Sequence, residues 1–388
     1  MKPAGEPFRV EVAQEILDDL AARLARTRWP QTVLADAGWS LGTKAEYAQR
    51  LARRWQDGFD WRHWEARLNR FDQRLIEIED QAVHTLIEPG SGADPLPLLL
   101  VHGWPGSIFE FIDLIEPLAH PERFGGRAED AFTVVVPSIP GFGFSSAPPR
   151  IWKPADYGLL WHRLMVEALQ VPRYVAAGGD KGAMTLSALG LNQPDRLLAL
   201  HLTMPGLFPY GDLETPLSDA ETAWLAAQAR AQAREGGYSH VQSTRPQSLA
   251  YGLTDSPMGL AGWIVEKFHA WTIPGEDSDP PFDMDHLLAN ITLYWITGIN
   301  AANHGYVAYQ DIASLAAPKG RRVEVPTGFL FFPGDLIPTP PRAMLERFYN
   351  VAEAETAPRG GHFPAMEQGE LLVEELRCFF RSYRGSAA

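Results

Sequence analysis

The chain has 388 residues, of which 45% are hydrophobic and 21% are charged. This length and composition predict a well-packed globular protein, built as one core plus a lid or as two domains. The formal net charge of -14 disfavours binding to nucleic acid or to anionic membrane surfaces, and the single cysteine, Cys378, excludes an internal disulfide and favours a cytoplasmic protein.

The sequence contains no signature of a membrane anchor or of a metal centre. It has no long apolar run, and its first residues lack the apolar stretch of a secretory signal. Cysteine and histidine residues do not cluster at metal-ligand spacing, so we expect no metal and no other cofactor. The 12 Trp and 19 Phe residues indicate an aromatic interior or pocket.

Residues 1–90 are expected to form an N-terminal extension. Apolar residues at helical spacing predict one helix over Val12–Arg28 and a second over about Lys44–Gly58. A segment dense in aromatic residues and arginines follows, and Arg74–Ile78 and Ala82–Ile87 are predicted to be a strand pair. We favour a structural collar, with tryptophans packed on the catalytic domain, over a separate binding module.

The first part of the core, residues 91–204, alternates predicted strands with helices. Continuous apolar runs predict strands that are covered on both faces, namely Pro95–Val101, Phe132–Pro137, Arg173–Ala177 and Leu198–Thr203. A helix is predicted over Pro154–Leu169. Strands that alternate with helices predict an α/β fold with a doubly wound, mostly parallel sheet.

Two loops at strand ends are candidates for the walls of a site. The sequence His102-Gly103-Trp104-Pro105-Gly106 follows the first strand, and a loop of this kind can present backbone N–H groups to an oxyanion. Ser138–Ala147 follows the second strand and is rich in glycine, but it lacks the spacing of a phosphate-binding loop. We expect it to shape one wall of the site.

The segment Val175–Leu186, VAAGGDKGAMTL, is the centre of the predicted chemistry. A buried strand runs through Gly178 and Gly179 into Asp180, and a helix follows Gly182. Glycines on both sides of one reactive residue are typical of a nucleophile elbow, because the sharp turn leaves no room for neighbouring side chains. A carboxylate there can attack an electrophilic carbon directly, as in an epoxide or an alkyl halide. The segment alone leaves open a second interpretation, in which the aspartate caps a helix.

Residues 205–319 are predicted to be a helical cap inserted in the core, which resumes over residues 320–388. The cap has no strand-like runs, and helical patterns occupy Ser218–Arg234, Ser256–Thr272 and Asp285–Thr297. An insertion at this point can close over the nucleophile and exclude water. In the second part of the core we expect a strand at Thr327–Phe332 and a terminal helix at Gly369–Tyr383.

Three residues in chain order complete the candidate site. Asp180 comes first, Asp335 follows a predicted strand, and His362 lies in a Gly-Gly-His loop. The order nucleophile, acid, histidine matches the α/β-hydrolase arrangement. In that arrangement Asp335 orients the imidazole of His362 and stabilises its charge, and His362 takes a proton from water.

A series of motifs runs through nearly the whole chain in one order: ARTRWP, DWRHWEARLNRF, HGWPGSIFEF, PSIPGFGFS, GGDKGA, GGYSHVQSTRPQ, LTDSPMGLAGWIVEKF, LYWITG, VPTGFLFFPGD and RGGHFPAMEQ. In these motifs the chain resembles the microsomal-type epoxide hydrolases, in a soluble form without the leading anchor. The resemblance implies an α/β-hydrolase fold with a helical cap and an N-terminal extension. It also implies hydrolysis of a small-molecule epoxide by water to a vicinal diol, without a cofactor, in detoxification or secondary metabolism.

The resemblance implies a role for each matching residue. Asp180 matches the nucleophile, Asp335 the acid, which is often Glu in relatives, and His362 the base that activates water. Two cap tyrosines of the family hold the epoxide oxygen and act as acids. Tyr238 matches the first of them, and for the second we choose Tyr306, with Tyr309 as the alternative.

The expected oxyanion hole and substrate pocket involve the HGWP loop and the residue after the nucleophile. The loop residues are His102, Gly103, Trp104 and Pro105, and backbone N–H groups near Trp104 and Lys181 are expected to stabilise the oxyanion. Family members usually carry Trp where this chain has Lys181. The backbone N–H survives this change, but a flexible cation replaces an indole wall, which could lower the pKa of the nucleophile, select a polar substrate or turn away from the pocket.

Two other interpretations share part of this pattern. A haloalkane dehalogenase uses the same Asp, acid and His logic, but it needs halide-binding donors, commonly an indole beside the nucleophile, and Lys181 supplies none. A non-catalytic α/β-hydrolase-fold ligand-binding protein is the alternative from another class, although every triad position is chemically competent. The sequence leaves open the identity of the epoxide, the regio- and enantioselectivity, and whether the chain forms a homodimer.

Overall fold

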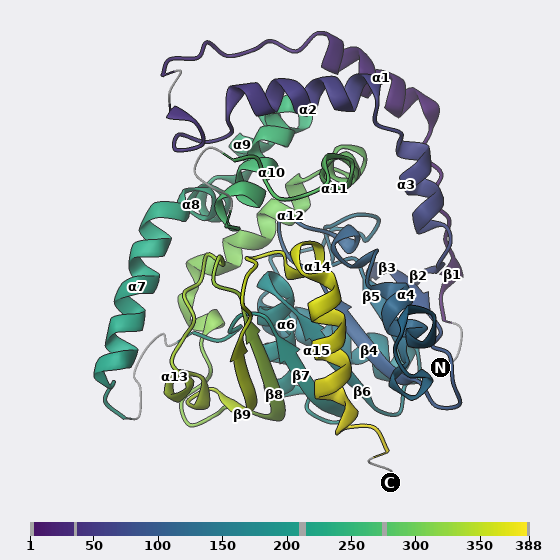
Figure 1. Cartoon of the computed structure of the whole chain (residues 1–388), viewed down its shortest axis with the longest axis vertical. Coiled ribbons are helices and arrows are strands. Elements are labelled where there is room, and N and C mark those ends of the chain that lie inside the picture. The colour runs from purple at the N-terminus through teal and green to yellow at the C-terminus, as the bar shows by residue number, and fades with distance from the viewer. Residues whose placement is uncertain (1–3, 35–36, 209–214, 274–277, 386–388) are drawn as a thin grey trace.

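A nine-stranded sheet forms the centre of the computed structural model, which describes residues 4–34, 37–208, 215–273 and 278–385 (Figure 1). The strands are β1 Glu6–Pro7, β2 Asp72–Ile78, β3 Gln81–Glu88, β4 Leu96–Val101, β5 Phe132–Pro137, β6 Tyr174–Gly178, β7 Leu197–Leu202, β8 Val323–Phe331 and β9 Tyr349–Thr356. Their order in the sheet is β1-β2-β3-β5-β4-β6-β7-β8-β9. The six strands from β5 to β9 are parallel, and β1, β2 and β3 are antiparallel at one edge. The predicted mostly parallel sheet is confirmed.

Alternate residues of the central strands pack on opposite faces of this sheet. Leu99 and Val101 of β4 belong to the cluster shared with α5 (Pro154–His162) and α6 (Asp180–Asn192). Leu98 and Leu100 belong to the cluster on the other face, with α4 (Ile115–Ala119) and α15 (Gly369–Arg381). Because both faces are covered, these strands are apolar throughout, which is why they were recognisable as continuous runs. The predicted helix over 154–169 is also present, with a π-helical last part, Arg163–Ala168.

The N-terminal extension contributes three helices that lie against both the cap and the core. They are α1 Gln14–Ala25, α2 Ala45–Asp57 and α3 Trp61–Leu68. The indole N–H of Trp55 donates to Thr292 Oγ1 of the cap at 2.9 Å, and the ring of Trp64 meets Phe109 of the core edge-on at 5.6 Å. The tryptophans therefore pack on both the cap and the core, and the structural collar stays a prediction. Figure 1 shows α1 and α2 running across the cap helices.

The chain between β7 and β8 forms the helical cap. Its helices are α7 Asp219–Glu235, α8 Gly237–Thr244, α9 Pro246–Asp255, α10 Pro257–Ala270, α11 Met284–Thr297 and α12 Asn300–His304, followed by the 3-10 turns η6 Gly305–Gln310 and η7 Ile312–Leu315. The three helices predicted here are confirmed with small changes at their ends. The boundaries of the four parts, at residues 90, 204 and 319, stay predictions.

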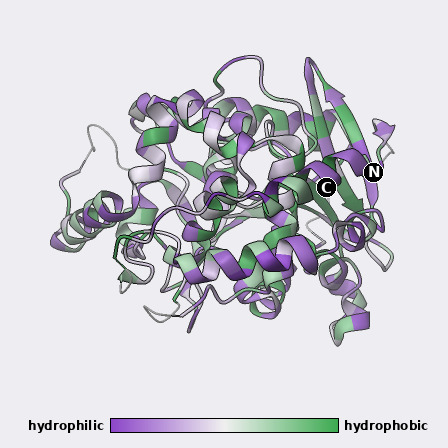
Figure 2. Cartoon of the chain, turned by 90° about the horizontal axis from the view of Figure 1, so that it is seen from above, coloured by the Kyte–Doolittle hydropathy of each residue, from purple (hydrophilic) through white to green (hydrophobic). Residues whose placement is uncertain are grey.

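Shorter elements connect the core strands. They are the 3-10 turns η2 Ile108–Phe111, η3 Pro121–Phe124 and η4 Ala128–Asp130, and the helices α13 Arg342–Glu346 and α14 Pro364–Glu367. Seen from above, hydrophilic and hydrophobic residues are mixed along the strands at the edge of the sheet (Figure 2).

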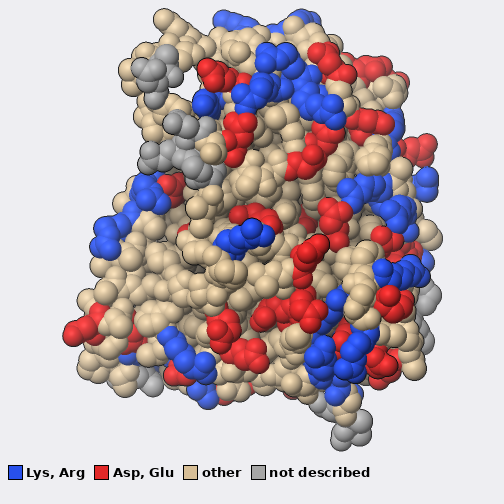
Figure 3. Space-filling view, viewed as in Figure 1, with Lys and Arg blue, Asp and Glu red and all other residues tan. Residues whose placement is uncertain are grey.

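The surface carries charges of both signs. On the face in Figure 3, basic side chains are interspersed with acidic ones and are not gathered into one patch. Among the described helices, none combines the length and the apolar character that a bilayer-spanning segment requires.

Candidate active site

The turn between β6 and α6 brings Asp180 to a point where two loops meet. Asp180 has a φ of +46°, in the left-handed region that side chains rarely adopt. A Cβ on Gly182 would lie 2.0 Å from the carbonyl oxygen of Val101, and a Cβ on Gly103 would lie 2.3 Å from the Cβ of Asp180. The turn therefore requires these glycines. The N-cap of α6 is Gly179, so the alternative in which the aspartate only caps the helix is wrong.

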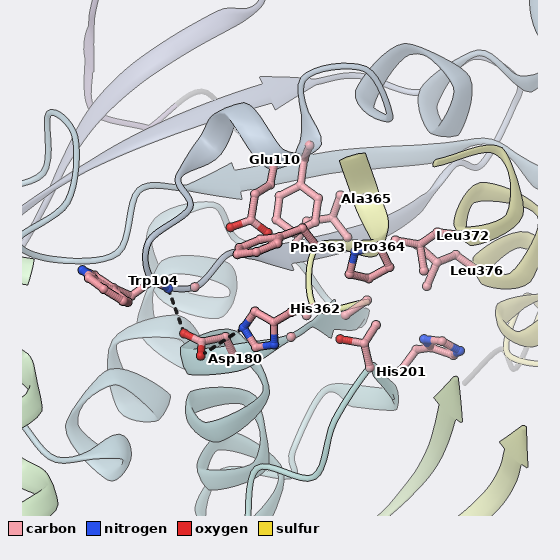
Figure 4. Close-up of a pocket in the computed structure, with 17 residues that line it drawn as sticks. Trp104, Glu110, Asp180, His201, His362, Phe363, Pro364, Ala365, Leu372 and Leu376 are labelled. Atoms are coloured by element: carbon pink, nitrogen blue, oxygen red, sulfur yellow. Dashed lines mark hydrogen bonds and ion pairs between the residues drawn. The ribbon is translucent and has the colours of Figure 1, made fainter. Parts of the chain in front are cut away.

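The carboxylate of Asp180 is held by a backbone donor on one side and faces a histidine on the other. The N–H of Trp104 donates to Oδ1 at 2.8 Å, and Nε2 of His362 lies 3.5 Å from Oδ2 (Figure 4). Burial opposes its ionisation, but the hydrogen bond and charge of His362 and the charge of Lys181 outweigh burial and lower the pKa of Asp180. The group is therefore an ionised carboxylate at neutral pH.

A second carboxylate holds the other nitrogen of the imidazole. Nδ1 of His362 lies 2.8 Å from Oδ1 of Asp335, which also accepts from the N–H of Ile337 at 3.2 Å. Both side chains are buried. Burial disfavours the protonated ring and so lowers the pKa of His362. The charges of Asp335 and Asp180 outweigh this effect and raise the pKa well above its ordinary value. The backbone N–H of His362 donates to the carbonyl of Trp271 at 2.8 Å, so the cap helps to place the base.

The two tyrosines chosen from the sequence lie together at the cap side of the nucleophile. The rings of Tyr238, on α8, and Tyr306, on η6, are buried and meet edge-on, with 5.7 Å between their centroids. Both contact the indole of Trp104, which is stacked on Tyr238 and edge-on to Tyr306. Burial, reinforced by the charge of Asp180, raises the pKa of both phenols well above the ordinary value. They are neutral hydrogen-bond donors over the physiological range.

The alternative tyrosine, Tyr309, has its hydroxyl engaged elsewhere. It accepts from Nζ of Lys181 at 2.9 Å and donates to Sδ of Met184 at 3.4 Å. Nζ of Lys181 also lies 3.8 Å from the ring centroid of Tyr306. The lysine therefore does not turn away to solvent, and the residue is 8% exposed. Its charge contributes to the lowered pKa of Asp180, one of the three outcomes that the sequence left open.

The remaining residues predicted from the HGWP loop differ in what they contact. Gly103 and Trp104 border the cavity that contains Asp180 and His362. His102 is a support of the loop: the N–H of Ile139 donates to its Nε2 at 3.1 Å, so its Nδ1 carries the proton and donates to the carbonyl of Gly103 at 3.0 Å. Burial lowers the pKa of His102 to about 4, so it stays neutral.

The same loop is attached to the cap by three hydrogen bonds. Nδ2 of Asn290 donates to the carbonyl of Pro105 at 2.8 Å, the hydroxyl of Tyr294 donates to that of Gly106 at 2.7 Å, and the indole of Trp104 donates to Asn303 at 3.0 Å. Pro105 therefore acts through its backbone carbonyl, and the cap fixes the loop that holds the nucleophile.

Sequence reasoning missed Glu110, which lies on η2 and borders the cavity shared by Asp180 and His362. In Figure 4 its carboxyl group lies above this pair. Burial raises the pKa of Glu110 to about 8, although the charge of His362 opposes the rise. One feature of the sequence could have indicated that Glu110 is a site residue. It is a carboxylate inside the apolar run Ile108–Phe111, where burial of an unpaired charge is costly.

The site provides an ionised carboxylate, a histidine held by a second carboxylate, and two neutral phenols. Among the described residues, no group of three or more His, Cys, Asp or Glu side chains is arranged to hold a metal ion. An aspartate on the turn after β6, with an aspartate after β8 and a histidine after β9 of a parallel sheet, defines an α/β hydrolase. In agreement, the family model described as alpha/beta hydrolase fold matches residues 97–238.

The chain belongs to the epoxide hydrolase family. The family model described as epoxide hydrolase N terminus matches residues 5–111. A Stigmatella aurantiaca protein, provisionally named an epoxide hydrolase, is 39% identical over 97% of this chain and 85% of its own length. Epoxide hydrolase 1 of Oryctolagus cuniculus is 31% identical over 96% of this chain and 88% of its own length.

Solved structures agree with this assignment. The epoxide hydrolase of Aspergillus niger superposes with a TM-score of 0.83 at 30% identity, covering 98% of this chain and 97% of that chain. The juvenile hormone epoxide hydrolase of Bombyx mori gives a TM-score of 0.82 at 26% identity, covering 99% and 96% of the two chains. The protein is therefore an enzyme of the epoxide hydrolase type with an α/β-hydrolase fold and a helical cap.

Proposed function

We propose that the protein converts an epoxide to a vicinal diol in two steps, through a covalent hydroxyalkyl ester on Asp180. The observation that carries this proposal is the placement of His362, whose Nε2 lies 3.5 Å from the carboxylate of Asp180 while Asp335 holds its Nδ1 at 2.8 Å. A base in this position cannot be needed to activate a carboxylate that is already ionised. It is suited to activate water against an ester formed on that carboxylate.

In the first step Asp180 attacks a ring carbon of the epoxide. Oδ1 is held by the N–H of Trp104, so Oδ2 is the attacking atom. The C–O bond of the epoxide breaks as the ester bond forms, and the released oxygen takes a proton from Tyr238 or Tyr306. Neutral phenols suit this role because the developing alkoxide is strongly basic, and a phenol can follow its charge without placing a cation in an apolar pocket.

In the second step water attacks the carbonyl carbon of the ester. Esterification removes the charge of Asp180, which is one of the two charges that raise the pKa of His362. The pKa of His362 therefore falls, so the imidazole becomes neutral and free to accept a proton at the moment when a base is required. The oxyanion forms at Oδ1, beside the N–H of Trp104, with the N–H of Lys181 as the second proposed donor. When the intermediate collapses, the leaving alkoxide of the diol takes the proton from the imidazolium of His362. The new carboxyl group returns its proton to the phenolate left by the first step, which restores both the carboxylate and the phenol.

The test is mass spectrometry of the His362→Ala variant after exposure to terminal, aryl and internal epoxides, with matching alkyl halides in parallel. Loss of the base should stall the second step, so an added mass equal to a whole epoxide should accumulate on the peptide that contains Asp180. The Asp180→Asn variant is the control and should gain no such mass. An adduct from halides alone, or an adduct on another residue, would contradict the proposal.

A further inference from the structure

We propose that Lys181 is an anion-binding group in the pocket beside the proposed nucleophile, and that the preferred epoxide carries a carboxylate a few bonds from its ring. This inference rests on the proposed function, and it assigns a substrate class to the same site. It is carried by the surroundings of the lysine, by the lining of the pocket that it faces, and by the route from that pocket to the surface.

The ammonium of Lys181 is buried with few polar contacts. The residue is 8% exposed, and among the described residues its hydrogen bond is to the hydroxyl of Tyr309 at 2.9 Å. The other contacts are aromatic faces, with Nζ 3.8 Å from the ring centroid of Tyr306 and 4.7 Å from that of Tyr309. An ammonium has three N–H donors, so the group retains donor capacity toward the pocket.

The charge of Lys181 has no ion-pair partner among the described residues. Asp180 precedes it in the chain, but the oxygens of that carboxylate are directed to Trp104 and His362. Lys267, a buried lysine of the cap, differs from Lys181 because it forms an ion pair with Glu266. A buried charge is costly unless it is paired, so an anion brought by the substrate would supply what the protein does not.

The pocket beside Lys181 is mostly apolar, and the hydroxyl-bearing residues in its lining are Tyr157, Thr185 and Tyr309. Its walls include Ile139, Phe142, Trp152 and Met184, and of the described residues that line it Lys181 alone is charged. In such surroundings a hydrogen bond between an ammonium and a carboxylate is stronger than in water. Nζ of Lys181 lies 3.8 Å from the ring centroid of Tyr306, so this pocket adjoins one of the proposed acids.

A wider groove continues from this pocket toward the surface. The two cavities share Trp152, Tyr157 and Gly305, and the described lining of the groove contains Arg150 and His304 but no Asp or Glu. Arg150 pairs with Asp156 at 2.6 Å, so it is not a free cation, yet the route as a whole presents no carboxylate to an incoming anion. This is notable in a chain with a net charge of -14.

Gly305 lines both the pocket and the groove. A Cβ added there would lie 3.7 Å from the hydroxyl of Tyr157 and 3.8 Å from Nζ of Lys181, which are ordinary contact distances. The absence of a side chain at this position keeps the space between the tyrosine and the lysine open. Because Nζ also lies against the ring of Tyr306, a carboxylate on the lysine and an epoxide oxygen on that phenol must be close neighbours in one molecule.

The test compares 4,5-epoxypentanoate with its neutral methyl ester, using the purified full chain at pH 7. The measured quantity is the ratio of kcat/KM for the acid to kcat/KM for the ester. We expect the acid to be preferred, and the Lys181→Met variant to lower the ratio by about tenfold or more. Lys181→Arg keeps the charge and should keep the preference. The matched control is Lys267→Met, which removes the other buried lysine and should leave the ratio unchanged.

The outcomes separate this inference from the proposed function. If wild type hydrolyses both compounds with equal kcat/KM, or if Lys181→Met lowers both equally, the anion subsite is wrong while the epoxide hydrolase proposal stands. A higher kcat/KM for the ester than for the acid in wild type would also show that the anion subsite is wrong, and would leave the epoxide hydrolase proposal standing. If neither compound is turned over but His362→Ala gains an adduct from another epoxide of the panel, the subsite alone is wrong. If no epoxide gives an adduct, both proposals fail together. The subsite is supported if Lys181→Met lowers the ratio of kcat/KM for the acid to kcat/KM for the ester and Lys267→Met leaves this ratio unchanged.

Discussion

The indole of Trp104 and the ring of Tyr238 lie parallel, with 4.9 Å between their centroids and 4° between their planes. Trp104 belongs to the loop after β4 of the core, and Tyr238 belongs to α8 of the cap. The backbone N–H of the same tryptophan holds the carboxylate of Asp180 at 2.8 Å. One residue therefore fixes the distance between the proposed nucleophile and a proposed acid, across the boundary between core and cap.

The three cap tyrosines should differ in their effect on the first step. Phe in place of Tyr238 or Tyr306 removes a donor to the leaving oxygen, and each change should slow ester formation by about 100-fold or more. Tyr309→Phe should have a much smaller effect, because that hydroxyl binds Lys181 and Met184. The rate of adduct formation in a His362→Ala background, followed by rapid quenching and mass spectrometry, isolates this step. A larger effect of Tyr309→Phe than of Tyr306→Phe would make Tyr309 the second acid.

Replacement of Asp335 should act on the second step. Asp335→Asn keeps the size of the side chain but removes the charge that orients and stabilises the imidazolium of His362, held now at 2.8 Å. Ester hydrolysis should fall by about 1,000-fold or more, and the ester should accumulate during turnover. Asp335→Glu, which keeps the charge, should retain more of the rate. A rate that is retained in Asp335→Asn and lost in Asp335→Glu would show that the position provides shape and not charge.

The sheet was predictable because burial on both faces leaves a simple mark in the sequence. The strand predicted over Phe132–Pro137 is found with the same bounds as β5, and its residues are nearly all buried. The helix α3 was not predicted from its sequence, WRHWEARL. Its apolar residues are large tryptophans that contact Phe109 and His286, and these contacts between distant parts of the chain decide its conformation.

The candidate site was predictable as far as it follows from chain order. Asp180, Asp335 and His362 each follow a strand of one parallel sheet, so the topology alone brings them to the same edge. The roles of Glu110 and Lys181 could not be predicted in this way. Glu110 becomes buried only when the turn η2 packs against the loop that carries His362, and the direction of the Lys181 side chain depends on the cap tyrosines that it contacts.

The stability of the protein should reveal the burial of Glu110. Burial raises the pKa of Glu110 to about 8, from 4.5 in an exposed side chain. Between these two values the folded protein keeps a proton that the unfolded chain releases, so ionisation of this group disfavours folding as the pH rises, and no further above about pH 8. Glu110→Gln cannot ionise. Its melting temperature relative to wild type should therefore increase from pH 5 to pH 8 and then level off.

Between pH 5 and pH 8, the free energy of unfolding of Glu110→Gln should increase relative to that of wild type by an amount on the order of a few kcal/mol at most. Scanning calorimetry of both proteins at a series of pH values measures it, because all other titrating groups are shared and cancel in the difference. A difference between the two proteins that does not change with pH would show that the carboxyl group is well solvated in the folded state.

A buried ion pair should stabilise the attachment of the cap to the core. Arg347 contacts Glu221 of α7 through two hydrogen bonds, Nε to Oε1 at 2.5 Å and Nη2 to Oε2 at 3.0 Å, and its Nη1 donates to the carbonyl of Thr215 at 3.0 Å. Arg347→Leu leaves the buried Glu221 without its charged partner, although the hydrogen bonds from Ser218 remain, and should cost about 3–5 kcal/mol of the free energy of unfolding at pH 7. Urea unfolding measures this loss. Arg322→Leu, which breaks an exposed pair, is the control and should have a far smaller effect.

The effect of Arg347→Leu should also depend on pH. The hydrogen bonds from Arg347 are the largest cause that lowers the pKa of Glu221, to about 2. A lowered pKa in the folded state means that the pair stabilises the protein above the ordinary pKa of 4.5, and that this stabilisation is lost as the pH falls toward 2. The difference between wild type and variant should therefore shrink below about pH 4.5. A constant difference down to pH 3 would show that the arginine acts through packing alone.

The proposed preference for an epoxide acid should disappear at alkaline pH. Burial lowers the pKa of Lys181 to about 8, against the opposing charge of Asp180. The ammonium is therefore present below that pH and is lost as the pH rises through it. The ratio of kcat/KM for 4,5-epoxypentanoate to that for its methyl ester reports the free enzyme, so it should be constant up to about pH 7 and fall between pH 7 and pH 9.

The titratable groups around Lys181 should not contribute to the fall of this ratio between pH 7 and pH 9. Burial raises the pKa of the facing tyrosines, Tyr157, Tyr306 and Tyr309, so that they stay neutral over this range, and Asp180 stays ionised because its pKa is lowered. Glu110 titrates in the same range but acts on both substrates, so its effect cancels in the ratio. Lys181→Arg supplies the matched variant, because a guanidinium keeps its charge, and its ratio should stay constant to pH 9. A fall of the same size in Lys181→Arg would assign the titration to another group and remove this support for the anion subsite.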